Sequence, residues 1–136
     1  MPRPHIEFIQ TQMLDWERSN INSSALVKNL SFDNSNGAST NIIRYPKNFE
    51  ANTSHYLECD EEFLILSGRI LINENSYAKG DYAFFPSGYS RRKIKCEEQT
   101  DILNYYEGRN KPIFSKEIQN IDHSKLVVKL ETIKAD

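Results

Sequence analysis

The sequence is poor in cysteine and has neither a long apolar run nor an excess of basic residues. Its 136 residues contain two cysteines, Cys59 and Cys96, whereas a secreted disulfide scaffold of this size usually carries more. Residues 1–7 lack the apolar core of a signal peptide, and no segment approaches the roughly 18 apolar residues that a membrane span requires. These absences predict a cytoplasmic protein with reduced thiols and no membrane partner.

The charged residues are nearly balanced. The 17 Lys and Arg against 19 Asp and Glu give a net charge of −2. Strong general affinity for nucleic acid requires a basic excess, so we expect no nucleic-acid partner. Hydrophobic residues make up 38% of the chain, which is ordinary for a globular protein, and the length suits one domain with its own core.

Short apolar stretches separated by turn residues predict an all-β fold. Turn signals recur every 8–12 residues or so, the spacing typical of a sandwich or barrel. Residues 6–17 fit either a short strand or a helical turn. The expected strands are 26–32, 38–45, 63–66, 69–72, 82–85, 91–96 and 101–106, with a return strand at Tyr77 and a last strand within 126–130.

Some of these strands carry an expectation about burial. Residues 63–66 are apolar at every position, which predicts burial on both faces. The basic residues in 91–95 instead suggest a charged edge strand. Six aromatic side chains are expected mainly in the core, namely Phe63, Tyr82, Phe84, Phe85, Tyr105 and Tyr106.

Two segments combine turn residues with residues that can carry chemistry. Residues 55–68 read HYLECDEEFLILSG, with a histidine at the start, an acidic run and a closing glycine. Residues 80–91 read GDYAFFPSGYSR, in which Gly-Asp and Pro-Ser-Gly mark turns. The histidine and the acidic run make the first segment a candidate site.

Over residues 55–108 the chain resembles the cupin superfamily. His55 matches the first histidine of the first cupin motif, and Glu61 matches its glutamate. Leu57 stands where the second histidine usually lies. The second motif fits except at its last position, where Arg91 replaces a histidine.

The resemblance implies a cupin-type double-stranded β-helix, which is a jelly-roll barrel, as a single domain over residues 1–136. N-terminal strands would occupy 1–54, the barrel motifs 55–108, and a last strand and tail 109–136. The opening of the chain also resembles a group of uncharacterised bacterial cupin-domain proteins of the RmlC-like type. Because cupins commonly pair, we expect a homodimer.

The resemblance also implies a metal site that is incomplete. Cupin centres hold a divalent ion with three histidines and a glutamate, of which only His55 and Glu61 are kept. Arg91 stays protonated and repels a cation. Tyr89 or His5 would have to be recruited by folding. We therefore predict no metal cofactor; if a divalent metal binds, His55 and Glu61 hold it.

Arg91 would bring a fixed positive charge into the barrel, with Glu61 as its natural partner through a charge-assisted hydrogen bond. Spacing from Gly88 selects Arg91 for the inward position. Strand parity with Ile94 selects Arg92, since residues two apart share a face. A bulge after Gly88 would reconcile the two, and Arg91 is the favoured candidate.

These residues support functions of different classes. The first is a small-molecule-binding protein without a standard catalytic metal, whose ligand is a small anionic metabolite held by His55, Glu61, Tyr89 and Arg91. The alternative is an enzyme that uses His55 and Glu61: a metal-dependent lyase or oxygenase, or a metal-independent isomerase with His55 as general base and Tyr89 as acid. A purely structural dimer is a third hypothesis. The sequence does not decide between an enzyme and a binding protein.

Overall fold

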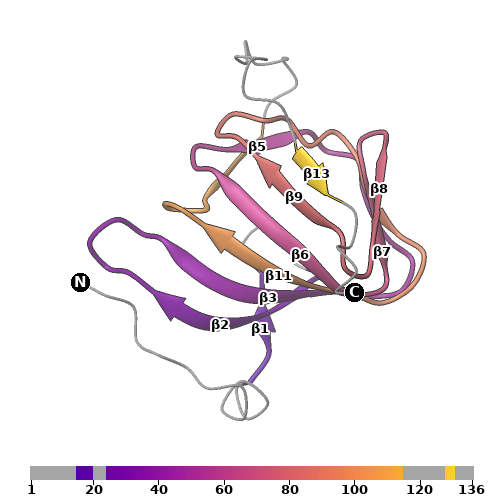
Figure 1. The fold of residues 1–136 in the computed structure, drawn as a ribbon, viewed down its shortest axis with the longest axis horizontal. Helices are drawn as coiled ribbons and strands as arrows, with labels where there is room; N and C mark the ends of the chain where they lie inside the picture. Colours follow the sequence, from indigo (N-terminus) through magenta and orange to yellow (C-terminus); the bar gives the residue numbers. More distant parts are fainter. Residues whose placement is uncertain (1–14, 20–23, 115–127, 131–136) are drawn as a thin grey trace.

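The computed structural model of the chain describes residues 15–19, 24–114 and 128–130. Over these residues the backbone forms strands and no helix, which confirms the all-β prediction (Figure 1). The described part thus has no helix long and apolar enough to cross a membrane. The strands are β1 (Glu17–Arg18), β2 (Leu26–Phe32), β3 (Ser39–Tyr45), β4 (Phe49–Ala51), β5 (His55–Leu57), β6 (Glu61–Ser67), β7 (Arg69–Ile72), β8 (Asn75–Ala78), β9 (Tyr82–Phe85), β10 (Ile94–Cys96), β11 (Thr100–Tyr106), β12 (Pro112–Phe114) and β13 (Val128–Leu130).

A seven-stranded sheet and a four-stranded sheet make up most of the fold. The large sheet has the order β1-β2-β3-β11-β6-β9-β13, and the small sheet has the order β4-β10-β7-β8. A separate antiparallel pair joins β5 to β12. In Figure 1 the strands β2, β3, β11, β6 and β9 lie side by side, and β7 and β8 stand at one side of them. Strands that are distant in sequence therefore become neighbours, as β11 does between β3 and β6.

The core lies between the sheets, because alternate residues of each strand point inward. Every second residue is buried along Ser39–Tyr45 and along Thr100–Tyr106. Three core rings pack edge to face, with the Phe63 centroid 5.3 Å from that of Tyr77 and 5.2 Å from that of Phe85. The other core side chains are Ala25, Ile43, Tyr45, Phe49, Leu57, Cys59, Ile65, Ile70, Ile72, Ala83, Ile94, Cys96, Ile102 and Tyr106.

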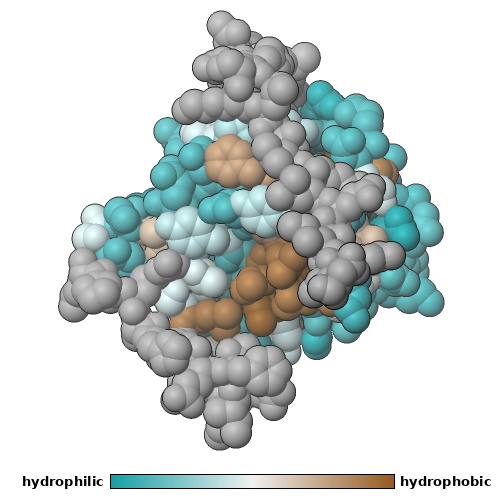
Figure 2. All heavy atoms as spheres, in the orientation of Figure 1, coloured by the Kyte–Doolittle hydropathy of each residue, from teal (hydrophilic) through white to brown (hydrophobic). Residues whose placement is uncertain are grey.

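The outward face of the large sheet is also partly apolar. Ile42, Leu103 and Leu64 lie opposite one another on β3, β11 and β6, and each is half-buried. A hydrophobic patch lies over this sheet in Figure 2, within a mainly hydrophilic face. The prediction that residues 63–66 are buried on both faces is wrong: Leu66 is 36% exposed, because β6 belongs to an antiparallel sheet with one outward face.

The segment 91–96 also differs from its prediction. Only Ile94–Cys96 forms a regular strand. The backbone N–H of Arg92 donates a hydrogen bond to Oδ1 of Asn73 at 2.7 Å instead of to the backbone of a neighbouring strand. This short strand, β10, lies between β4 and β7. The prediction of a charged edge strand is therefore wrong: Lys95 lies within a strand that is paired on both sides, and Lys93 lies next to it.

Most other predicted strands are confirmed to within a residue or two. The return strand at Tyr77 is β8, and β13 falls within the predicted last strand. The strands β4, β5 and β12 were not predicted, since three residues are too few to show a period. Of residues 6–17, those before 15 lie outside the described residues. Among the six aromatic residues, Phe63, Phe85 and Tyr106 are buried, whereas Tyr82, Phe84 and Tyr105 are half-buried on the opposite face.

Two glycines with the same backbone conformation offer a matched test of this packing. Gly68 and Gly88 have φ angles of 86° and 85°. A Cβ at Gly68 would lie 2.5 Å from the carbonyl oxygen of Gln99, whereas no described atom lies within 4 Å of a Cβ at Gly88. We predict that Gly88→Ala lowers the free energy of unfolding by about 1–2 kcal/mol, because alanine is strained in this left-handed conformation. Gly68→Ala should cost about 1–3 kcal/mol more, because the strand β11 must move. Urea unfolding measures the free energy of unfolding of both variants. Equal losses of stability in the two would contradict the close contact at Gly68.

Candidate functional site

A small cavity lies at the centre of the barrel that the sheets enclose. Its volume is about 30 Å³. The lining is apolar on most sides, with a histidine, a glutamate, an arginine and an asparagine among it. The lining residues are Tyr45, His55, Leu57, Glu61, Phe63, Ile70, Ile72, Arg91, Ile94, Ile102, Asn104 and Tyr106.

Backbone pairing places His55 directly opposite Arg91. The N–H of His55 donates to the carbonyl of Arg91 at 3.1 Å, and the N–H of Arg91 donates to the carbonyl of His55 at 2.8 Å. Two residues that exchange backbone hydrogen bonds in this way present their side chains on the same face. Each of the two residues is 4% exposed. The predicted convergence of these side chains therefore has a backbone cause.

Glu61 is the first residue of β6 and shares its inward face with Phe63 and Ile65. Its Oε1 accepts a hydrogen bond from Nη2 of Arg91 at 2.5 Å, and its Oε2 accepts one from Nδ2 of Asn104. Glu61 is 6% exposed, so these two donors take the place of water around its carboxylate. Both carboxylate oxygens have donors, which a buried carboxylate requires.

Arg91 is held by three different contacts. One is the ion pair with Glu61, and a second is the hydrogen bond from Nη1 to the carbonyl of Tyr89 at 3.0 Å. The third is with Phe85, whose ring centre lies 5.1 Å from the guanidinium carbon, within the range of a cation–π interaction. A guanidinium has five N–H donors. Two of them make hydrogen bonds to described residues, so the cation keeps hydrogen-bonding capacity where it lines the cavity.

His55 is neutral in this environment. Burial, and then the positive charge of Arg91, lower the pKa of His55 from 6.5 to about 4, while a hydrogen bond with the backbone of Thr53 acts in the opposite direction. Its ring lies 5.5 Å from that of Phe114, between centroids. At neutral pH His55 therefore adds no second positive charge beside Arg91, and it is a weak base.

The donor set does not fit a divalent metal. Both oxygens of Glu61 are already engaged, one of them by a permanent cation at 2.5 Å. Leu57 lines the cavity with an apolar side chain. Within the described residues, no group of three or more His, Cys, Asp or Glu could hold a metal ion, and His5 lies outside those residues. A metal at His55 and Glu61 would have to displace Arg91, so we assign no chemical step to a metal.

Tyr89 lies apart from the cavity. Its hydroxyl accepts a hydrogen bond from Nδ2 of Asn73 at 2.9 Å, and its ring packs on that of Phe85 with 4.6 Å between centroids. It is not one of the residues that line the cavity. The candidate base His55 and the candidate acid Tyr89 therefore do not face one space, which gives an isomerase mechanism less support.

The inward arginine is Arg91. Its side chain is 5% exposed, whereas that of Arg92 is 48% exposed and donates to both carboxylate oxygens of Glu74 at 2.8 and 3.0 Å. The chain between Arg91 and Ile94 belongs to no regular strand. Strand parity counted back from Ile94 therefore fails, and the spacing from Gly88 is the better guide.

Sequence reasoning missed Asn104. This residue lies in β11 between Ile102 and Tyr106 on the inward face, and it is 4% exposed. Its amide supplies the second donor to Glu61. The signal that could have found it is parity, because a polar residue at an inward position of an otherwise apolar strand needs a buried partner.

The cavity volume limits what can bind at the barrel centre. About 30 Å³ holds one or two water molecules. Sites for drug-sized molecules measure roughly 300–1,000 Å³. With the side chains as they stand, only a group of a few atoms fits beside Arg91.

The chain belongs to the family of ChrR cupin-like domains, whose pattern matches residues 5–110. This match confirms the resemblance to the cupin superfamily that the two motifs indicated. No curated protein sequence matches the chain.

Solved structures share this jelly-roll fold. A putative dioxygenase from Nostoc punctiforme has a TM-score of 0.71 at 15% identity, over 79% of this chain and 39% of its own. A putative acetylacetone dioxygenase from Methylibium petroleiphilum has a TM-score of 0.69 at 14% identity, over 96% and 92%. Rhodobacter sphaeroides SigE in complex with the anti-sigma ChrR gives 0.56 at 14% identity, over 69% and 50%. The chain thus spans about two fifths of the Nostoc protein, and at these identities the likeness shows the fold alone.

We predict that His55 makes the protein acid-sensitive. The pKa is about 4 in the folded protein and 6.5 without the burial, so the unfolded chain binds the proton more readily. Stability from neutral His55 is therefore fully present above pH 6.5 and is lost as the pH falls through 4. The loss is about 3 kcal/mol. Urea unfolding at intervals across this pH window should show that the His55→Gln variant lacks this pH-dependent loss of stability. Curves for the two proteins that stay parallel would contradict the buried neutral histidine.

Proposed function

We propose that this chain is a small-molecule-binding cupin module whose ligand is a small anion held by Arg91, with the Arg91–Glu61 pair in the place of a divalent metal. The observation that carries the proposal is a buried guanidinium that lines the central cavity and uses two of its donors on described residues. A buried cation with free donors binds carboxylate, phosphate and other oxyanions through charge-assisted hydrogen bonds.

The surroundings of Arg91 would let an anion bind to it while Glu61 stays in place. The carboxylate of Glu61 is held on its other side by Asn104, so its position does not depend on Arg91 alone. Neutral His55 lines the same cavity and offers a hydrogen-bonding group without a competing charge. We place His55, Glu61 and Arg91 in the ligand site.

The small cavity narrows the class of ligand. Formate or nitrate is the size of group that about 30 Å³ allows. A larger metabolite would have to present only its carboxylate to Arg91, with movement of the surrounding strands. The proposal is therefore for an anion of very few atoms.

The relatives do not decide between catalysis and binding. Solved structures of this fold include proteins named as dioxygenases and an anti-sigma protein in a complex, so one fold serves both roles. The enzyme hypothesis lacks a metal-ligand set among the described residues and a cavity shared by His55 and Tyr89. Homodimerisation and a cytoplasmic location stay predictions from the sequence.

A matched pair of double variants tests the proposal. Arg91→Met with Glu61→Gln removes the buried pair without leaving an unpaired charge, and Arg92→Met with Glu74→Gln makes the same change on the exposed pair. Thermal unfolding is followed while sodium formate or nitrate is titrated at constant ionic strength. We expect a saturable rise in Tm for the natural protein and for the exposed-pair variant, and none for the buried-pair variant. Succinate serves as the oversized anion and should give no saturable rise.

Two results would overturn the anion proposal. One is an equal response of the natural protein and the buried-pair variant to formate. The other is the same saturable response to formate and to succinate, which would place the anion on the surface.

A further inference from the structure

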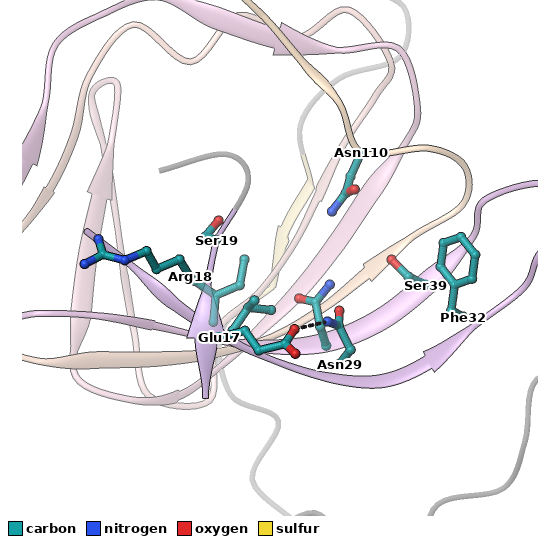
Figure 3. Close-up of a pocket in the computed structure, with 10 residues that line it drawn as sticks. Glu17, Arg18, Ser19, Asn29, Phe32, Ser39 and Asn110 are labelled. Carbon is teal, nitrogen blue, oxygen red and sulfur yellow. Dashed lines mark hydrogen bonds between the residues drawn. The ribbon is translucent and has the colours of Figure 1, made fainter. Parts of the chain in front are cut away.

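A second and much larger pocket lies away from Arg91. Its volume is about 430 Å³, within the range of ordinary ligand sites. It lies beside β1, β2 and β3, and Figure 3 shows side chains from these strands and Asn110 gathered around it. The lining residues are Glu17, Arg18, Ser19, Val27, Asn29, Phe32, Ser39, Asn41, Ile43 and Asn110.

A row of three asparagines connects this pocket with the barrel centre. Asn29 pairs with Asn41 across β2 and β3, and Asn41 pairs with Asn104 across β3 and β11. Asn29 is exposed, whereas Asn41 is 2% and Asn104 is 4% exposed. The row therefore runs from the surface to the amide that holds Glu61.

Asn41 has an unmet acceptor in this row. Its Oδ1 is buried and has no hydrogen-bond partner among the described residues. A buried carbonyl without a donor is costly, and such groups are rare in folded proteins. Asn41 lines the large pocket, so a turn of its side chain would bring the buried Oδ1 within reach of a donor on a molecule bound there.

The other lining residues define the chemistry of that molecule. Glu17 and Arg18 carry opposite charges, and the remaining polar lining is made of serine and asparagine, so the pocket favours a neutral ligand. Amides and hydroxyls bind groups that both donate and accept, as sugar hydroxyls do. Phe32 is 55% exposed and offers a flat apolar surface for the C–H face of a ring.

We propose that this pocket binds a neutral, hydroxyl-rich molecule of monosaccharide size, with Oδ1 of Asn41 accepting a hydrogen bond from one hydroxyl. Asn29 and Ser39 lie beside Asn41 at the neighbouring strand positions and bind further hydroxyls. Asn29 is held by Glu17, whose Oε2 accepts from its Nδ2 at 3.3 Å, so the two act together at the mouth. This site is separate from the anion site at Arg91 and does not depend on it.

Titration with single sugars tests the proposal. Glucose, galactose, mannose and ribose are each added to tens of millimolar, and binding is measured by ligand-observed NMR and by calorimetry. We expect at least one to bind the natural protein. Asn41→Leu removes the acceptor and nearly keeps the side-chain volume. It should lower the affinity for that sugar by about tenfold. Asn52→Leu changes an exposed asparagine outside the pocket and should leave the affinity unchanged.

The unfolding curve of Asn41→Leu separates ligand binding from a structural role. Because the variant removes a buried unpaired carbonyl, its Tm should equal or exceed that of the natural protein. A structural hydrogen-bonding role for Asn41 would lower the Tm instead. Phe32→Ser changes an exposed side chain, so it should also lower the affinity for the sugar without unfolding the protein.

The sugar proposal is overturned if none of the four sugars binds the natural protein, or if Asn41→Leu and Phe32→Ser bind as tightly as Asn52→Leu. A fall in Tm for Asn41→Leu without a change in sugar affinity also overturns it. The formate response of Asn41→Leu should match that of the natural protein, so failure at one site is distinguishable from failure at the other.

Discussion

The buried ion pair between Arg91 and Glu61 governs the arrangement at the barrel centre. Desolvation of two charges offsets most of their attraction, so such a pair adds little net stability. Removal of one partner costs about 3–5 kcal/mol, because the other charge is left buried alone. The pair is therefore mainly a constraint: Asn104 must donate to the second oxygen of Glu61, and the guanidinium adds to burial in keeping His55 neutral.

The same constraint determines which functions the barrel can support. A guanidinium bound to Glu61 prevents the convergence of ligands that a divalent ion needs, and the central cavity that it lines has a volume of only about 30 Å³. Chemistry that requires a large substrate at the centre is thereby disfavoured, whereas a small anion remains compatible. A neutral ligand has more room in the pocket lined by Asn41, where strand pairing continues the polar row outward from Asn104.

Much of the fold could be predicted, because turn residues are local signals. The loop before Ser39 and the glycine at Gly68 mark real turns, and the strands beside them follow. The inward face of Glu61 came from its spacing to Gly68 in the cupin motif. The exposure of Leu66 could not be predicted, since an all-apolar strand does not reveal which face meets the core. Asn104 and the cavity volume depend on contacts between strands distant in sequence, which no local pattern contains.

Elemental analysis tests most directly the claim that an arginine has replaced the metal. The protein is expressed in medium supplemented with iron, manganese and zinc, dialysed and measured by mass spectrometry. The double variant Leu57→His with Arg91→His restores the cupin ligand set and serves as the positive control. We expect metal well below one equivalent in the natural protein and metal binding in the variant. Stoichiometric metal in the natural protein that a chelator does not readily remove would contradict it.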